Sequence, residues 1–194
     1  EIVAWAVDRF GARLALTASF ADTTLIDVAT AVAPDVEVIF LDTGFHFAET
    51  LATVRRAMDR YSLNLTVLRP GPDAADVWAD GSDRCCANRK VEPLDRHLAG
   101  RVDAWMSGVR RADSPDRAIA PIISIDRRGL VKVNPLANMT DEQHERYVLE
   151  HDVVMNTLLV DGYASIGCWP CTEPSTDGRS GRWGGTKTEC GLHL

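Results

Sequence analysis

Short apolar runs recur along the first half of the chain, each with the length and residue types of a buried strand. They lie at 14–18, 36–41, 65–68 and 102–106. Amphipathic stretches alternate with them, and their apolar side chains recur at helical spacing. These stretches lie at 1–10, 23–33, 48–61 and, starting at the cysteine pair, from 85 to about 99. Strand–helix alternation at this spacing predicts βαβ units and a mainly parallel twisted sheet.

The second half of the chain has weaker patterns. Apolar residues at 122–126 and 130–133 flank an Arg-Arg-Gly turn and predict a hairpin. Thr140 and Gln143 have the spacing of a capping box, which predicts a helix to about residue 150, and a short helix is expected over 152–160. Beyond Gly162 no periodicity remains. We therefore expect one α/β domain over 1–194, with helices on both faces of the sheet and with 172–194 as an irregular, mobile tail.

Composition narrows the function classes. The chain has 194 residues, 45% of them hydrophobic and 25% charged, which is typical of one globular domain. Its net charge of −7 argues against nucleic acid or an anionic membrane as a general partner. No apolar run reaches the length of a membrane span, and no secretory signal opens the sequence. The opening residues resemble the middle of a helix, so we expect the chain to begin inside a longer protein.

The five cysteines form two tight pairs and one single residue. Cys85 and Cys86 are adjacent, whereas Cys168 and Cys171 form a CxxC motif. Four thiolates suit zinc or an iron–sulfur cluster, and adjacent ligands are easier to accommodate when each cysteine binds a different iron. Buried free cysteines or a redox-active CxxC would explain the same spacing. Without a signal peptide, this cysteine usage fits an intracellular metal or redox protein, and we expect a cytoplasmic location.

Basic residues gather beside the cysteines and strand ends although the chain is acidic overall. They are Arg84, Arg89 and Lys90, then Arg110 and Arg111, and finally Arg179, Arg182 and Lys187. A solvated face is the ordinary explanation for such runs. Guanidinium groups, however, match phosphate and sulfate oxygens well, so the combination suggests a substrate with more than one acidic group.

Cys190 is the single cysteine and the candidate nucleophile. Lys187 and His193 are local candidates to lower the pKa of its thiol, whereas Glu189 would raise it. A free thiol on a disordered chain end and a surface histidine would explain these residues equally well.

A family resemblance is carried by motifs that span nearly the whole chain. They are Ser19-Phe20, Leu41-Asp42-Thr43-Gly44, Cys85-Cys86 with Arg89-Lys90, Trp105 with Ser107 to Arg111, Ile166 to Thr172, Gly181-Arg182-Trp183, and Lys187 with Glu189 to His193. With these motifs the chain resembles the iron–sulfur type of assimilatory adenylyl-sulfate reductase, actinobacterial in character, within the phosphoadenylyl-sulfate reductase family.

The resemblance implies roles for individual residues. Cys85, Cys86, Cys168 and Cys171 would bind one 4Fe–4S cluster. Cys190 would attack the sulfur of adenosine 5′-phosphosulfate, leaving AMP and an S-sulfocysteine from which thioredoxin or a similar dithiol releases sulfite. The positions implied to contact the substrate or close the tail over it are Ser19, Phe20, Leu41, Gly44, Lys90, Arg110, Arg111, Arg179, Arg182 and His193.

Three rival functions stay open at this point. Relatives that reduce 3′-phosphoadenosine 5′-phosphosulfate usually lack the two cysteine pairs, whereas some cluster-containing members accept both nucleotides. An ATP pyrophosphatase of the sulfur-transfer type would require a Ser-Gly-Gly-x-Asp-Ser turn, which the residues from Ser19 to Thr23 match poorly. A non-catalytic metal or redox module would explain the paired cysteines but leave Cys190 without a role. A homo-oligomer is compatible with all of these functions.

Overall fold

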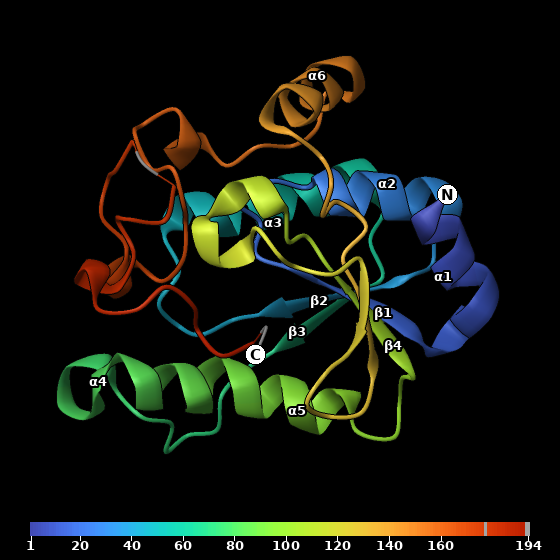
Figure 1. Ribbon diagram of the computed structural model, residues 1–194. Helices are drawn as coiled ribbons and strands as arrows, with labels where there is room; N and C mark the ends of the chain where they lie inside the picture. Colours follow the sequence, from blue (N-terminus) through green and yellow to red (C-terminus); the bar gives the residue numbers. More distant parts are fainter. Residues whose placement is uncertain (177, 193–194) are drawn as a thin grey trace.

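The computed structural model describes residues 1–176 and 178–192. Its centre is a six-stranded sheet with the order β3-β2-β1-β4-β6-β5 (Figure 1). The strands are β1 (Leu14–Ala18), β2 (Glu37–Leu41), β3 (Leu65–Leu68), β4 (Ala104–Ser107), β5 (Ile123–Ile125) and β6 (Val131–Val133). Neighbouring strands are parallel except β5 and β6, which pair as the predicted antiparallel hairpin. The expected α/β class and mainly parallel sheet are confirmed.

Helices cover both faces of the sheet (Figure 1). On one face, α1 (Ile2–Phe10), α2 (Thr24–Val32) and α3 (Ala48–Tyr61) pack over strand residues such as Leu16 and Phe40. On the other face, α5 (Glu92–Leu98) packs Leu94 and Leu98 against Ala15, Ile39 and Trp105. Successive strand residues therefore point into different cores, because side chains alternate across a strand. Burial on both faces explains why these strands are continuous apolar runs.

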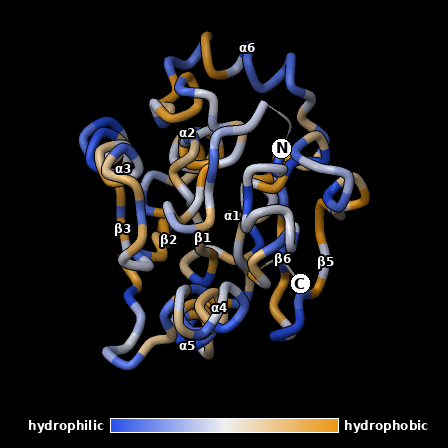
Figure 2. Tube along the Cα trace, turned by 90° about the vertical axis from the view of Figure 1, so that its left-hand side faces the viewer, coloured by the Kyte–Doolittle hydropathy of each residue, from blue (hydrophilic) through white to orange (hydrophobic). Residues whose placement is uncertain are grey.

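The helix α6 (Asp141–His151) lies outermost and is largely hydrophilic (Figures 1 and 2). The predicted capping box is present: Gln143 N donates to Thr140 Oγ1 over 3.2 Å, and Thr140 N donates to Gln143 Oε1 over 3.0 Å. None of its residues is buried, so it contributes little to the core. The helix nevertheless forms part of a cavity wall, as described below.

The helix predicted to start at Cys85 starts earlier, and that prediction was wrong. α4 (Val77–Cys86) begins where the Asp76 side chain accepts hydrogen bonds from the backbone N–H groups of Trp78 and Ala79. Gly81 interrupts it with a φ of 79°, so the segment resembles a loop in sequence. A π-helical turn (Ala87–Val91) joins α4 to α5, and it contains Arg89 and Lys90. Such turns often mark functional sites.

The short helix expected over 152–160 is also absent as such. Asp152 ends α6 in the left-handed conformation (φ 50°), and only a 3₁₀ turn (Thr157–Leu159) follows. The Asn156 side chain caps this turn by accepting from Leu158 N, so the turn starts at Thr157 and not at 152. The remaining described residues are irregular, with 3₁₀ turns at Trp169–Cys171 and Trp183–Gly185. Within the described ranges, no helix combines the length and apolarity needed to cross a bilayer.

Candidate active site

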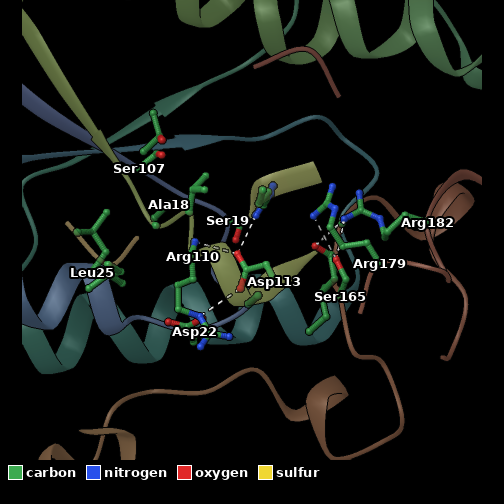
Figure 3. A pocket seen from close by; sticks show the side chains of 18 of the residues that line it. Ala18, Ser19, Asp22, Leu25, Ser107, Arg110, Asp113, Ser165, Arg179 and Arg182 are labelled. Atoms are coloured by element: carbon green, nitrogen blue, oxygen red, sulfur yellow. Dashed lines mark hydrogen bonds and ion pairs between the residues drawn. The ribbon is translucent and has the colours of Figure 1, made fainter. Parts of the chain in front are cut away.

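A cavity of about 640 Å³ opens at the carboxyl ends of the central strands. Its wall includes Ser19 after β1, Leu41 at the end of β2 and Ser107 at the end of β4. Connections leave β1 towards β2 on one side, whereas β4 lies on the other side, so the cavity sits where the strand order reverses. Open α/β sheets bind ligands in such a crevice. Figure 3 shows Arg110 and Asp113 on one side of it, with Arg179 and Arg182 beside Ser165.

The Ser19 turn depends on an unusual backbone conformation. Phe20 has a φ of 57°, which is uncommon for a residue other than glycine. Its ring is fully buried and packs edge-on against Phe40 with centroids 5.3 Å apart, and Asn156 Nδ2 donates to its carbonyl over 3.2 Å. These contacts hold the strained turn so that Ser19 and Asp22 face the cavity. Phe20 itself is a core residue and not part of the cavity wall, so its placement does not support the predicted substrate contact.

The end of β2 contributes Leu41 to the cavity wall, and the loop after it contributes His46. His46 Nε2 lies 2.8 Å from the Leu41 carbonyl oxygen, and burial lowers the pKa of this histidine, as does the nearby Lys90 ammonium. Gly44 adopts a φ of 78° and is outside the wall; Arg89 packs beside it and donates to the Thr43 carbonyl over 3.0 Å. The prediction is therefore supported by placement for Leu41 but not for Gly44. His46 had no signal in the sequence.

Lys90 joins two cavities. It lines the large cavity and also the smaller one that contains all four paired cysteines. Burial would lower the pKa of its ammonium, but the thiol groups of Cys168, Cys190 and Cys86 outweigh that effect, so the pKa lies above its ordinary value. Lys90 therefore stays positively charged next to both the paired cysteines and Cys190.

Arg182 is the second cation that faces sulfur. It is only 4% exposed, and its guanidinium lies 4.3 Å from the centroid of the Trp183 ring. Burial lowers its pKa, whereas the Cys168 and Cys190 thiols oppose that shift. Gly167 makes room for it, since a Cβ on Gly167 would lie 2.0 Å from Arg182 Nη2. The glycine before the CxxC motif thus has a packing reason that the sequence alone did not reveal.

Cys190 is half-buried and lines the same cavity as Lys90 and Arg182. Lys187, a local candidate to activate it, instead has its Nζ 2.6 Å from Asp83 and 3.7 Å from Cys86 Sγ. Glu189, expected to oppose activation, is paired with Arg117 at 2.6 Å. The charges around Cys190 are therefore supplied by residues distant in sequence.

Two of the other predicted basic residues, Arg110 and Arg179, line the cavity, whereas Arg111 does not. Arg110 lines the cavity but is paired with Asp113 at 3.1 Å and with Asp141 at 2.9 Å. Arg111 is not part of the cavity wall, and it donates to the Ala120 carbonyl and to Asn138 Oδ1. Arg179 lines the cavity and donates to the Thr188 carbonyl. His193 lies outside the described residues.

The four paired cysteines line one small cavity, where Cys85, Cys86 and Cys168 are buried. Burial and the neighbouring Cys86 and Cys168 thiols raise the pKa of Cys85 to about 11, and burial and Cys168 also raise that of Cys171. Thr43 Oγ1 lies 3.2 Å from Cys168 Sγ, so a hydroxyl donor is available to a thiolate there. The donor set thus suits a metal centre that keeps the thiols deprotonated.

The four paired cysteines share one cavity without converging on a single point. In the part of the chain that the structure describes, no three His, Cys, Asp or Glu side chains converge on one ion position. In a 4Fe–4S cluster each cysteine binds a different iron, so the four thiols need only surround a common cavity. The four cysteines meet that requirement.

Comparison with known proteins places this site in context. The profile of the phosphoadenosine phosphosulfate reductase domain matches residues 13–174. An adenosine 5′-phosphosulfate reductase of Mycobacteroides abscessus is 43% identical over 206 aligned positions, which cover 100% of this chain and 86% of that protein. The enzyme of the same name from Streptomyces coelicolor is 44% identical and covers 100% and 87%. These alignments include the segment around Cys190, beyond the end of the domain profile.

Solved structures show the same fold. The phosphoadenylyl-sulfate reductase of Candida auris, in a phosphate complex, superposes with a TM-score of 0.75 at 30% identity, covering 89% of this chain and 88% of that one. The FMN adenylyltransferase of Candida glabrata superposes with a TM-score of 0.67 at 13% identity, covering 97% and 71%. The second similarity concerns the fold alone.

Proposed function

The chain belongs to the phosphoadenosine phosphosulfate reductase family, and we propose that it reduces adenosine 5′-phosphosulfate to sulfite and AMP. The observation that carries this proposal is the shared cavity of Cys190, Lys90 and Arg182 at the carboxyl edge of the sheet. A free thiol, two cations and a strand-end crevice are the groups that attack on a sulfated nucleotide requires.

In the first step the Cys190 thiolate attacks the sulfur of the phosphosulfate. A sulfur–sulfur bond forms, the bond from sulfur to the bridging oxygen breaks, and its electron pair leaves with AMP. Negative sulfate oxygens shield that sulfur, so Lys90 and Arg182 would stabilise the charge that a thiolate meets on approach. Ser19 and the other groups at the strand ends would hold the phosphate and adenosine.

In the second step a dithiol protein such as thioredoxin attacks Cys190 Sγ. Sulfite departs with the electron pair of the broken sulfur–sulfur bond, and the second thiol of the reductant resolves the mixed disulfide. The reductant thus supplies both electrons, and Cys190 returns as a thiol. For this step the 172–194 tail would have to open, which is the purpose we assign to its irregular structure. A cytoplasmic location would provide such a reductant.

Cys85, Cys86, Cys168 and Cys171 would hold a 4Fe–4S cluster. When bound, this group would supply a fixed charge distribution next to the substrate, since the thiols already account for both reducing equivalents. Lys90 would stand between this group and the phosphosulfate.

The test is a sulfite- and AMP-release assay with purified protein, thioredoxin and either nucleotide. We expect turnover of adenosine 5′-phosphosulfate and, without reductant, one S-sulfonate on Cys190 detected by mass spectrometry. Preferred turnover of the 3′-phosphorylated nucleotide would reassign the substrate. Absence of sulfite with both nucleotides, from protein that retains its metal, would instead favour a non-catalytic metal module.

A further inference from the structure

The carboxylate of Glu189, directly before Cys190 in sequence, has two arginine partners. Arg117 binds it with two hydrogen bonds, Nε to Oε1 over 2.6 Å and Nη2 to Oε2 over 3.1 Å. Arg179 Nη2 lies 3.6 Å from Oε2. The Glu189 side chain is 15% exposed, and those of Arg117 and Arg179 are 14% and 13% exposed. A bidentate pair this well shielded has defined geometry and is weakly screened by salt.

Arg117 is itself held in place from its other side. Its Nη1 lies 2.9 Å from Asp113 Oδ2, and Asp113 also pairs with Arg110. Arg110 in turn binds Asp141 at the start of α6 over 2.9 Å. The ion pairs therefore form a chain that runs from the tail to α6. Arg117 is a fixed anchor for Glu189, because its position is set by partners that do not belong to the tail.

The residues on either side of Glu189 and Cys190 are also docked. Arg179 Nε and Nη2 both donate to the Thr188 carbonyl oxygen, over 3.0 and 2.9 Å. Leu192 packs against the core cluster that contains Leu94 and Trp105. Cys190 thus lies between a polar anchor at 188–189 and an apolar anchor at Leu192.

The basic residues of the cavity consequently serve two purposes. Lys90 and Arg182 line the cavity together with Cys190. Arg117, which lies outside the tail, binds Glu189, whereas Arg179 is a tail residue that contacts Thr188 and Glu189 within the tail. We propose that Glu189 is the positioning residue of the nucleophile: bound to Arg117 outside the tail and braced by Arg179 within it, it docks the tail so that Cys190 lines the same cavity as Lys90 and Arg182. This inference rests on the proposed role of Cys190, and it gives Arg179, a predicted substrate contact, a bracing role within the tail.

The clamp also defines what must break before a reductant protein reaches Cys190. Release of the tail separates Glu189 from Arg117 and exposes both charged groups to water, where each is solvated separately. Glu189 therefore controls two properties together, the rate of attack in the docked state and the accessibility of Cys190.

Alkylation of Cys190 in the metal-loaded protein tests the proposal without depending on turnover. Wild type, Glu189→Gln and Glu189→Asp are treated with iodoacetamide, and the Cys190 peptide is quantified by mass spectrometry. A buried hydrogen bond to a charged group contributes enough that its loss should raise the alkylation rate about tenfold or more in Glu189→Gln. Single-turnover S-sulfonation should fall by a similar factor, while AMP affinity changes by less than about twofold. Glu189→Asp keeps the charge, so its alkylation and S-sulfonation rates should lie between those of the wild type and Glu189→Gln.

Glu173→Gln is the matched control, because it removes the same charge from an exposed part of the tail. It should leave both rates unchanged. Arg117→Met should reproduce the effects of Glu189→Gln, and the double variant should be no worse than either single one, since both remove one interaction. Wild-type alkylation and S-sulfonation rates in Glu189→Gln would overturn the proposal, as would fully additive effects in the double variant. If the wild type released no sulfite at all, the proposed function would be refuted. The alkylation rates would still show whether Glu189 docks the tail.

Discussion

Replacing Gly167 with alanine tests whether the buried guanidinium of Arg182 supports the chemistry at Cys190. The added Cβ would lie 2.0 Å from Arg182 Nη2, 2.5 Å from Cζ and 2.9 Å from Nη1. Ordinary van der Waals contact begins at 3.4 Å, so the guanidinium would have to retreat by about 1.4 Å (3.4 − 2.0). Gly167 has no positive φ, so the effect is one of space and not of backbone strain.

The guanidinium has little room for this retreat. Arg182 is 4% exposed, lies over Trp183, and donates from Nη1 to Ser165 Oγ and to the Ile166 carbonyl, both over 3.3 Å. Overpacking of this kind costs about 1–3 kcal/mol of stability. A displacement of about 1 Å in a charge-stabilising group lowers the rate roughly 100-fold. We therefore expect a stable but slow enzyme.

The assay is single-turnover formation of the Cys190 S-sulfonate without reductant, with thermal unfolding measured in parallel. Gly71→Ala is the control, because a Cβ there meets no atom within 4 Å. In an Arg182→Ala background the Gly167→Ala change should cost nothing further, since the group it displaces is gone. A wild-type rate in Gly167→Ala, or a full second loss in the Arg182→Ala background, would refute the reasoning.

Three further predictions concern single side chains. Cys190→Ser should abolish S-sulfonate and sulfite formation while the iron–sulfur absorption of the purified protein is retained; residual sulfite release would remove Cys190 from its role as nucleophile. Lys90→Ala should lower kcat about 100-fold with unchanged iron and sulfide content, and unchanged turnover would contradict an electrostatic role. Burial would raise the pKa of Asp126, but hydrogen bonds from Arg128 and Trp105 hold it below its usual range. Its carboxylate therefore stabilises the fold above an unfolded pKa of about 4, and this contribution is lost as pH falls through the folded pKa. Asp126→Asn should cost about 1–3 kcal/mol near pH 7 and progressively less below about pH 4 in thermal unfolding; an equal cost at both pH values would contradict it.

Local patterns were reliable guides to the elements of this fold. The strands and α1 to α3 were predicted because their apolar residues recur at fixed spacing, and α6 because Thr140 and Gln143 satisfy each other within one turn. The start of α4 was missed because one side chain, Asp76, caps a segment whose Gly81 suggests a loop. A cap is a specific hydrogen bond, and composition does not report it.

The candidate site was only partly predictable. Cysteine spacing and the family resemblance indicated Cys190, Lys90 and Arg182, which the structure brings to one cavity. They also suggested Phe20, whose side chain lies in the core, and Arg111, which binds Ala120 and Asn138 and is not part of the cavity wall. A motif identifies a segment, whereas the direction of each side chain depends on backbone angles such as the φ of 57° at Phe20.

The sequence by itself determined the α/β class and the order of most elements. It also showed that four cysteines lie in two closely spaced pairs and that Cys190 stands apart from them. Each of these depends on neighbours a few residues apart. Only the tertiary structure decided which charges surround the nucleophile. Arg117 and Glu189 are 72 positions apart, and their contact exists because the turn after β4 and the tail pack against the same cavity. Chain folding sets such distances, so the clamp on Cys190 had no signal in the order of its residues.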